Sequence, residues 1–269
     1  MLRIVATLVL LCLHIGTALD TSARATSLFT GNWAEIQSTF ANVEELRPVP
    51  IEEQFRSASG MLGKKEVQFS SAAFSSLGIQ YARMVSLCGD GFDVFNFLAV
   101  PRSGDMPMFG ADIVILPGGI LAAIDFQPVS SSPSHFTNSH YSSNLDLFQK
   151  WQTSFPPGGE LPPAAQRYFS PHALWTRFGA DDHDKLTKVQ SAMLDYCRAY
   201  CQCLSRVRDG LADREADDRK QFIADYLEYR TLNDPAKNML VGAFGKDWTE
   251  AILRKVLFPH HHPSSLSTD

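Results

Sequence analysis

The chain lacks the short motifs that usually identify a cofactor or a nucleophile. Its 269 residues contain no GxGxxG turn, no Walker A loop, no HExxH, no GxSxG and no CxxC. Each of these patterns carries a specific chemistry: dinucleotide binding, phosphate binding, zinc hydrolysis, acyl transfer or thiol redox exchange. If the chain is an enzyme, its substrate therefore supplies much of the electronic chemistry.

Strong charge and paired cysteines are also missing. Lys and Arg number 24 against 29 Asp and Glu, so the net charge is −5, which disfavours a generally basic nucleic-acid binder. Five cysteines are too few and too unevenly placed for a disulfide scaffold, and Cys197, Cys201 and Cys203 are expected to pack as small buried hydrophobes. With 45% hydrophobic residues, the composition is that of a globular α/β or α+β domain.

Only one long hydrophobic run is present, and it lies at the N-terminus. The run covers residues 4–15 behind Arg3, which is too short to span a bilayer and is typical of a signal peptide over residues 1–18. Residues 19–30 are rich in Ser, Thr and Ala, as in transit peptides. We expect a plastid protein with this two-step address; simple secretion is the alternative. The remainder is expected to be one domain over residues 31–258 and a flexible tail over 259–269.

The body of the chain begins with a helical pattern and continues with strands. Within residues 33–59, apolar residues recur every three or four positions up to Leu46, and Pro48 is expected to end the helix. Two strand patterns follow, at 79–87 and 92–100, and the next two (111–117 and 120–127) are joined by Gly118-Gly119, which suits a two-residue hairpin turn. Short turns predict an antiparallel meander, and its apolar residues on both faces predict a sheet covered on both sides.

From Asp181 onward the pattern is helical, with three successive apolar stripes. Strands followed by helices indicate an α+β fold with helices packed on the sheet.

Two carboxyl groups interrupt apolar strand patterns. If Gly118-Gly119 forms the turn, Asp112 lies directly opposite Asp125, where repulsion and burial raise at least one pKa and prepare a proton donor. The alternative places the acids at the rim of the sheet, where backbone N–H groups or an arginine stabilise them. Asn96 is a third polar residue in an apolar run, and a hydrogen-bonded core amide is its simplest interpretation.

Several segments in the same order resemble the ferredoxin-dependent bilin reductases. The resemblance extends over about residues 60–258. The segments that carry it are NFLAVPR (96–102), MPMFGADIV (106–114), LPGG (116–119), IDFQP (124–128), YFSPHALWTR (168–177) and YRTLNDPA (229–236).

The resemblance implies a three-layer α/β/α sandwich with a central antiparallel sheet, in which the open-chain tetrapyrrole lies between the sheet and the C-terminal helices. It also implies no bound flavin, nicotinamide or metal. Electrons arrive singly from a [2Fe–2S] ferredoxin and alternate with protons from the protein, through bilin radicals. Asp112 matches the sheet aspartate that protonates the bilin, and Asp234 matches a second catalytic aspartate. By itself, Asp234 is a typical helix cap.

The resemblance also bears on the substrate. Asn96 stands where the phycocyanobilin-forming branch has histidine, which argues against that product. The pattern around Asp112 is closest to the branch that reduces the A-ring diene of 15,16-dihydrobiliverdin, with sibling enzymes acting on biliverdin as the alternative. Asn96 and Asp125 are expected near the substrate. Arg102 and Arg177 could hold its propionates or form surface salt bridges.

The expected partners are the bilin and ferredoxin, and the upstream bilin reductase is a further candidate. The chain is expected to act as a monomer, without nucleic acid and without a membrane span in the mature protein. Lys64-Lys65 and Arg254-Lys255 are candidate contacts for an acidic ferredoxin. Two other functions remain open: a non-catalytic bilin carrier on the same scaffold, and a secreted hydrolase using Asp112 and Asp125.

Overall fold

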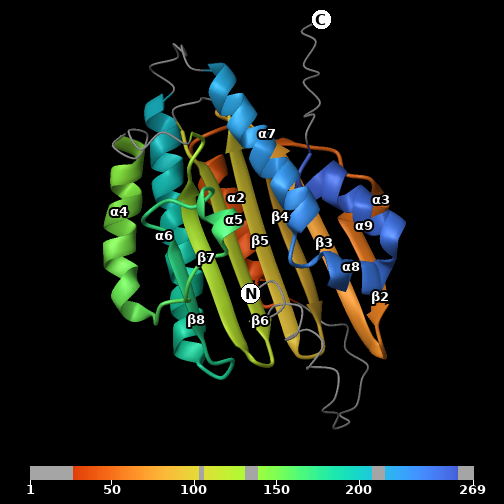
Figure 1. The fold of residues 1–269 in the computed structure, drawn as a ribbon. Coiled ribbons are helices and arrows are strands. Elements are labelled where there is room, and N and C mark those ends of the chain that lie inside the picture. The colour runs from red at the N-terminus through yellow and green to blue at the C-terminus, as the bar shows by residue number, and fades with distance from the viewer. Residues whose placement is uncertain (1–26, 103–105, 131–138, 208–215, 260–269) are drawn as a thin grey trace, which may run out of the picture.

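The apolar runs of the sequence form strands of one antiparallel sheet (Figure 1). This computed structural model describes residues 27–102, 106–130, 139–207 and 216–259. Within them the sheet has eight strands in the order β1-β3-β4-β5-β6-β7-β8, with β2 paired to β3. The strands are β1 (Arg47–Pro48), β2 (Ser57–Leu62), β3 (Lys65–Ser75), β4 (Ile79–Gly89), β5 (Phe92–Pro101), β6 (Met108–Leu116), β7 (Gly119–Gln127) and β8 (Leu174–Phe178).

Helices cover both faces of the sheet, which confirms the predicted three layers. The helices packed on one face are α2 (Thr30–Ala41), α4 (Ser139–Trp151) and α6 (His183–Val207), and the short turn η3 (Gln152–Ser154) follows α4. Those on the other face are α3 (Glu53–Arg56), α7 (Ala216–Asn233), α8 (Lys237–Phe244), α9 (Lys246–Ile252) and the π-helical turn η4 (Leu253–Leu257), with α5 (Pro163–Gln166) beside α7 in Figure 1.

The two-residue period of the strands divides the core in two. On β6, Phe109, Ala111 and Ile113 pack toward α2 and α6, while Met108 and Val114 pack toward the C-terminal helices. Because side chains alternate along a strand, Asp112 lies on the same face as Met108 and Val114. The sheet therefore directs Asp112 toward α7.

The hairpin between β6 and β7 turns one residue earlier than predicted. Leu116 pairs with Gly119, so Pro117 and Gly118 form the two-residue loop. Gly119 has a φ of 142°, and a Cβ there would lie 2.8 Å from the carbonyl oxygen of Phe178, so this position in the strand requires glycine.

The predicted pairing of the two acids is therefore wrong. Asp112 pairs with Ala123, and Asp125 pairs with Gly110. The two acids share a face of the sheet but occupy diagonal positions, two residues apart in register.

The first helix also ends earlier than predicted. It stops at Ala41, seven residues before Pro48, and the chain then turns toward the β3–β4 connection. There the buried carboxylate of Glu44 accepts hydrogen bonds from the Ser76 hydroxyl and from the Gly78 N–H, the latter at 3.1 Å. This contact joins segments more than 30 residues apart, so the apolar period of the helix does not predict it.

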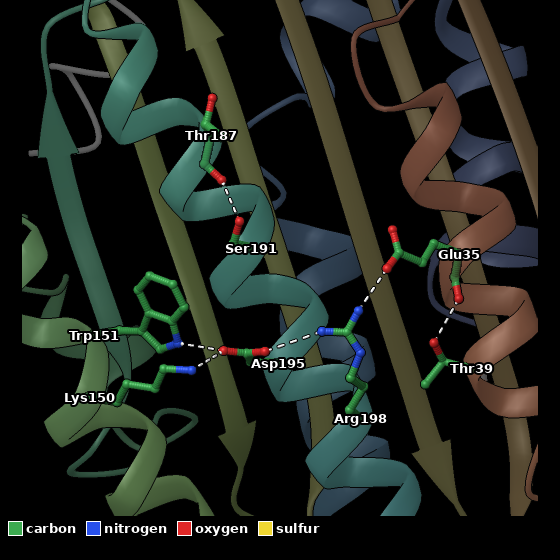
Figure 2. A network of polar contacts seen from close by, with 8 residues as sticks. All are labelled: Glu35, Thr39, Lys150, Trp151, Thr187, Ser191, Asp195 and Arg198. Atoms are coloured by element: carbon green, nitrogen blue, oxygen red, sulfur yellow. Dashed lines mark hydrogen bonds and ion pairs between the residues drawn. The ribbon is translucent and has the colours of Figure 1, made fainter.

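A polar network ties together the three helices on the first face (Figure 2). Asp195 of α6 accepts hydrogen bonds from Lys150 Nζ at 2.6 Å and Trp151 Nε1 at 3.2 Å, both at the end of α4. Arg198, also on α6, contacts Asp195 and reaches Glu35 of α2 at 2.8 Å. These groups lie at the surface, so the network orients the helices more than it stabilises them.

The described structure begins inside the segment predicted to be transit-like. Phe29 is fully buried and its ring lies 5.4 Å from that of Phe95. The buried carboxylate of Asp93 accepts hydrogen bonds from Ser27 Oγ at 2.9 Å and Leu28 N at 2.6 Å. The predicted signal peptide and all but the first residue of the predicted tail lie outside the described residues. None of the described helices is both long enough and apolar enough to cross a membrane.

Candidate functional site

The site is built around Asp112 in the middle of β6. Asn96 of β5 lies directly opposite Asp112 in register and donates a side-chain hydrogen bond to its carboxylate. The Asp112 side chain is 29% exposed, so it is partly open to a ligand. Asn96 is therefore hydrogen-bonded, as expected, and forms one half of a cross-strand polar pair with Asp112.

Arg83 of β4 fixes the orientation of Asn96. The Arg83 guanidinium donates to the Asn96 side-chain oxygen, while its Nε donates to the Leu257 carbonyl at 2.8 Å. Since the amide oxygen of Asn96 receives Arg83, its nitrogen faces Asp112. Burial lowers the pKa of Arg83 to about 10, which still leaves the guanidinium charged at neutral pH.

Helix α7 brings a second arginine and the second acid to the site. A guanidinium nitrogen of Arg230 lies 3.2 Å from Asp234 Oδ2 and 3.9 Å from Asp112 Oδ2, so Arg230 bridges the two carboxylates. The other oxygen of Asp234 accepts the Ala236 N–H at 2.8 Å in the turn between α7 and α8. Asp234 therefore closes the turn that leads into α8, whose N-cap position is Ala236, and its carboxylate lies close to Asp112 through Arg230.

The electrostatics of the cluster place a carboxyl group with a raised pKa beside a permanently charged guanidinium. Burial raises the pKa of Asp112 and repulsion from Asp234 adds to this, while Arg230, Asn96 and Arg83 act in the opposite direction. Burial alone lowers the pKa of Arg230, but Tyr226, Asp234 and Asp112 outweigh it, so the net pKa is raised. A carboxyl group with a raised pKa is a suitable proton donor near neutral pH.

These residues enclose a small cavity of about 30 Å³, room for a water-sized group. Two buried polar atoms among its lining side chains, Gln127 Oε1 and Arg230 Nε, have no hydrogen-bond partner within the described residues. One accepts and the other donates, which suits a ligand that presents both N–H and C=O groups. The lining residues are Arg83, Asn96, Phe97, Leu98, Gly110, Ala111, Asp112, Ala123, Gln127, Phe169, Tyr226 and Arg230.

A larger groove of about 690 Å³ lies next to this cavity, on the side of α5 and β8. Phe169 lines both, so it separates the polar cavity from the groove. The volume of the groove falls in the range of small-molecule sites, whereas the cavity alone is too small for a large ligand. A large flat molecule that reaches Asp112 must therefore also occupy space outside the cavity.

Asp125 lies outside both spaces. Its buried carboxylate accepts the Ser170 N–H at 2.7 Å, the Ser170 hydroxyl, and Asn144 Nδ2 at 3.2 Å. Burial raises its pKa to about 6, against the effect of these hydrogen bonds. The pKa of both acids is raised, where the prediction was at least one; desolvation is the main cause, and the two acids do not raise each other's pKa.

The two predicted propionate ligands lie away from the cavity. Arg102 is exposed at the end of β5, where its Nε donates to the Ser76 carbonyl at 3.1 Å. Arg177 is exposed on β8, opposite Leu121 of β7. Neither residue lines the polar cavity or the groove.

The candidate ferredoxin contacts are partly neutralised. Lys65 pairs with Asp90 at 3.1 Å, and Lys255 pairs with Glu52 at 2.7 Å. Arg254 lies 3.9 Å from Glu228. Docking of ferredoxin through these pairs stays a prediction.

Sequence reasoning missed Arg83, Tyr226 and Arg230. Two signals were available: Arg83 is a charged residue inside an apolar strand, and Arg230 precedes Asp234 by four residues, the spacing at which helical side chains meet. Tyr226 gave no such signal, because it fits the apolar stripe of its helix.

The arrangement can deliver protons from two places. Asp112 lies on the sheet side and Asp234 at the end of α7, with the Arg230 guanidinium between them. The described cysteines are all buried, and no cluster of three or more His, Cys, Asp or Glu suited to a metal occurs in the described part of the chain.

Comparisons with known proteins identify the family and support the fold. A family model described as ferredoxin-dependent bilin reductase matches residues 33–259. The phycoerythrobilin:ferredoxin oxidoreductase of Parasynechococcus marenigrum is 34% identical over 224 residues, covering 78% of this chain and 84% of that protein. That of Nostoc punctiforme is also 34% identical, covering 80% and 86%. Tomato phytochromobilin synthase, solved in complex with biliverdin, superposes with a TM-score of 0.75 and 25% identity over 86% of this chain and 82% of that one.

Proposed function

The chain belongs to the ferredoxin-dependent bilin reductase family, and from that premise we propose that it reduces the A-ring diene of 15,16-dihydrobiliverdin to phycoerythrobilin. As a family member it is an oxidoreductase that receives its electrons from ferredoxin. The relatives that share about a third of its residues over most of its length carry the name of this activity. That similarity supports the choice of substrate.

The proposed mechanism adds two electrons and two protons to the diene. Reduced ferredoxin supplies the electrons one at a time. Asp112, whose pKa is raised by burial, donates a proton from the sheet side. Asp234 donates from the side of α7, and Arg230 stabilises the negative charge that each electron adds.

The observation that carries the proposal is the pair of carboxyl groups bridged by one guanidinium. Asn96, oriented by Arg83, keeps a donor directed at Asp112. The unpartnered Gln127 Oε1 and Arg230 Nε suit the pyrrole N–H groups and the lactam oxygen of a bilin.

An anaerobic turnover assay tests the proposal. Biliverdin and 15,16-dihydrobiliverdin are offered separately to the chain lacking residues 1–26, with reduced plant-type ferredoxin, and absorbance is followed. Conversion of dihydrobiliverdin alone supports the assignment. Conversion of biliverdin indicates that the chain has the activity of a sibling bilin reductase. Tight binding without turnover indicates a carrier. No binding of either pigment refutes the proposal.

For its location we propose a plastid, reached through the secretory route. The support is the composition of the leader: an apolar run over residues 4–15 followed by a segment rich in Ser, Thr and Ala. A fusion of residues 1–30 to a fluorescent protein, expressed in an alga with a secondary plastid, tests this. Fluorescence in the plastid supports the proposal, and fluorescence in the medium favours simple secretion.

A further inference from the structure

One segment connects the sheet to helix α7 beside the cavity. Residues 167–171 run between α5 and β8, and Ser170 in this segment is held by Asp125 through both its N–H and its hydroxyl. Asn144 of α4 donates to both Asp125 and Ser170, at 3.2 and 2.8 Å. We call Asp125, Asn144 and Ser170 the clasp.

The same segment is attached to α7 by Tyr168, two residues before Ser170. The Tyr168 ring lies among the rings of Phe222, Tyr226 and Tyr229 with centroid separations of 5.6, 5.3 and 5.0 Å. The Tyr168 hydroxyl donates to the Asp225 carbonyl at 3.2 Å. One face of α7 therefore rests on this tyrosine.

Helix α7 needs such a support because the polar cavity lies between it and the sheet. Tyr226 and Arg230 line the cavity from α7, while Gln127 and Asp112 line it from the sheet. The sheet meets α7 there through the hydrogen bond between Gln127 and Tyr226 and the 3.9 Å separation of Arg230 from Asp112. A ligand between these layers competes with both contacts. The clasp lies outside the cavity: Ser170 lines the adjoining groove, and Asp125 and Asn144 line neither space.

We propose that Asp125 is a positioning residue. Through Ser170 and Tyr168 it fixes the distance of α7 from the sheet, and this distance determines where Arg230 and Asp234 lie relative to Asp112. The catalytic part of this inference rests on the proposed function. The mechanical part does not, because it concerns the attachment of α7 alone. Asp125 acts through the segment and touches neither the cavity nor the groove.

The chain offers a matched control for Asp125. Asp93 of β5 is also a buried carboxylate that accepts a serine hydroxyl and a backbone N–H, from Ser27 at 2.9 Å and Leu28 at 2.6 Å. It shares the β5 face of Phe95, packed toward α2, so its contacts are on the side of the sheet remote from α7. Asp125→Asn and Asp93→Asn therefore make the same chemical change on opposite faces.

The first measurement is hydrogen exchange of the α7 amides in both variants. In Asp125→Asn we expect exchange over residues 216–233 to be at least tenfold faster than in the unchanged chain, because asparagine keeps only one acceptor oxygen for the three donors that Asp125 receives from Ser170 and Asn144. In Asp93→Asn we expect exchange in α7 to be unchanged. Equal exchange in α7 for Asp125→Asn and the unchanged chain, or an equal rise in both variants, overturns the proposal whatever the enzyme reduces.

The second measurement separates binding from turnover. For Asp125→Asn we expect the Kd for dihydrobiliverdin to stay within threefold and kcat to fall at least tenfold, with neither changed in Asp93→Asn. A kcat in Asp125→Asn equal to that of the unchanged chain overturns the catalytic part. If the unchanged chain reduces no bilin, the proposed function fails, and hydrogen exchange still decides the mechanical part.

A milder variant keeps the test decisive if Asp125→Asn does not fold. Ser170→Ala removes the hydroxyl but retains the Ser170 N–H bond to Asp125, so we expect a smaller loosening of α7 in the same direction. Unchanged exchange in α7 for a folded Ser170→Ala contradicts the proposal in that case.

Discussion

At the scale of single residues, the site is a continuous polar chain of five side chains from strands and helices that are distant in sequence. Arg83 orients Asn96, Asn96 donates to Asp112, and Arg230 joins Asp112 to Asp234. Burying two arginines and two carboxyl groups costs desolvation energy, which partners and hydrogen bonds offset only in part. Such an arrangement contributes little to folding stability and is better explained by chemistry.

Replacing the sheet acid tests that explanation. In Asp112→Asn the amide keeps the shape of the side chain but has no acidic proton, so we expect bilin binding to persist while turnover falls by at least about 100-fold, as for loss of a general acid. Absorbance-monitored binding and anaerobic turnover measure the two effects. Turnover at the normal rate in this variant would remove Asp112 from the mechanism.

The raised pKa of Asp125 predicts a pH dependence of stability. The folded state has a pKa of about 6 against an ordinary value of 3.8, so between these values it binds a proton that the unfolded chain does not. This group therefore favours the folded state most below pH 3.8, and its contribution declines as the pH rises to about 6. At neutral pH the ionised carboxylate of Asp125 lowers the unfolding free energy by about 3 kcal/mol relative to its value below pH 3.8.

Asp125→Asn removes this titration. As the pH falls from 7 to 4, we expect the unfolding free energy of the unchanged chain to rise relative to that of the variant. Urea denaturation at several pH values measures it, with Asp184→Asn, whose side chain is 73% exposed, as the control. A difference independent of pH would contradict the prediction.

At the scale of elements, β2 and α8 approach each other unusually closely. A Cβ on Gly60 of β2 would lie 2.4 Å from the carbonyl oxygen of Ala243. Glycine is required there by packing and not by its φ, since the residue is not in the left-handed region. In α2, by contrast, a Cβ on Gly31 meets nothing within 4 Å.

The two glycines predict opposite effects for the same substitution. Gly60→Ala is expected to destabilise the fold by about 1–3 kcal/mol, as overpacking does. Gly31→Ala is expected to stabilise it by about 0.5 kcal/mol, because alanine favours the helix. Thermal unfolding measures both changes, and a stable Gly60→Ala protein would show that α8 can move away from β2.

At the scale of the whole molecule, the N-terminal segment belongs to the fold from Ser27 onward. Phe29 is buried against Phe95, and Asp93 is held by Ser27 and Leu28. A leader that is cleaved after residue 30 would remove these contacts. We therefore expect processing to occur before Ser27.

Two truncated chains test this boundary. A chain beginning at residue 27 is expected to unfold at the same temperature as the full chain. A chain beginning at residue 31 is expected to lose about 3–5 kcal/mol, the usual cost of removing a buried phenylalanine. Equal unfolding temperatures for the two truncated chains would show that the segment contributes nothing.

The strands and helices with a clear apolar period were predictable, and the elements without one were not. The four consecutive strands from β4 to β7 and the C-terminal helices follow their patterns, because burial of one face imposes a period on the sequence. The strands β1, β2, β3 and β8 were missed, and β3 is an exception to this rule, because its buried residues alternate along the strand. In β2 exposed and half-buried residues alternate without a strong apolar face, and β8 has only five residues.

Local sequence by itself determined the α+β class, the covered sheet, the meander and the presence of a carboxyl group inside β6. Only the tertiary structure decided the hairpin register, in which Leu116 pairs with Gly119 and β8 lies too close to Gly119 for a side chain there. It also decided the neighbours of Asp112. Arg83 and Arg230 are 147 residues apart, and whether they meet around one carboxyl group depends on how α7 crosses the sheet, which hydrophobic periodicity does not encode.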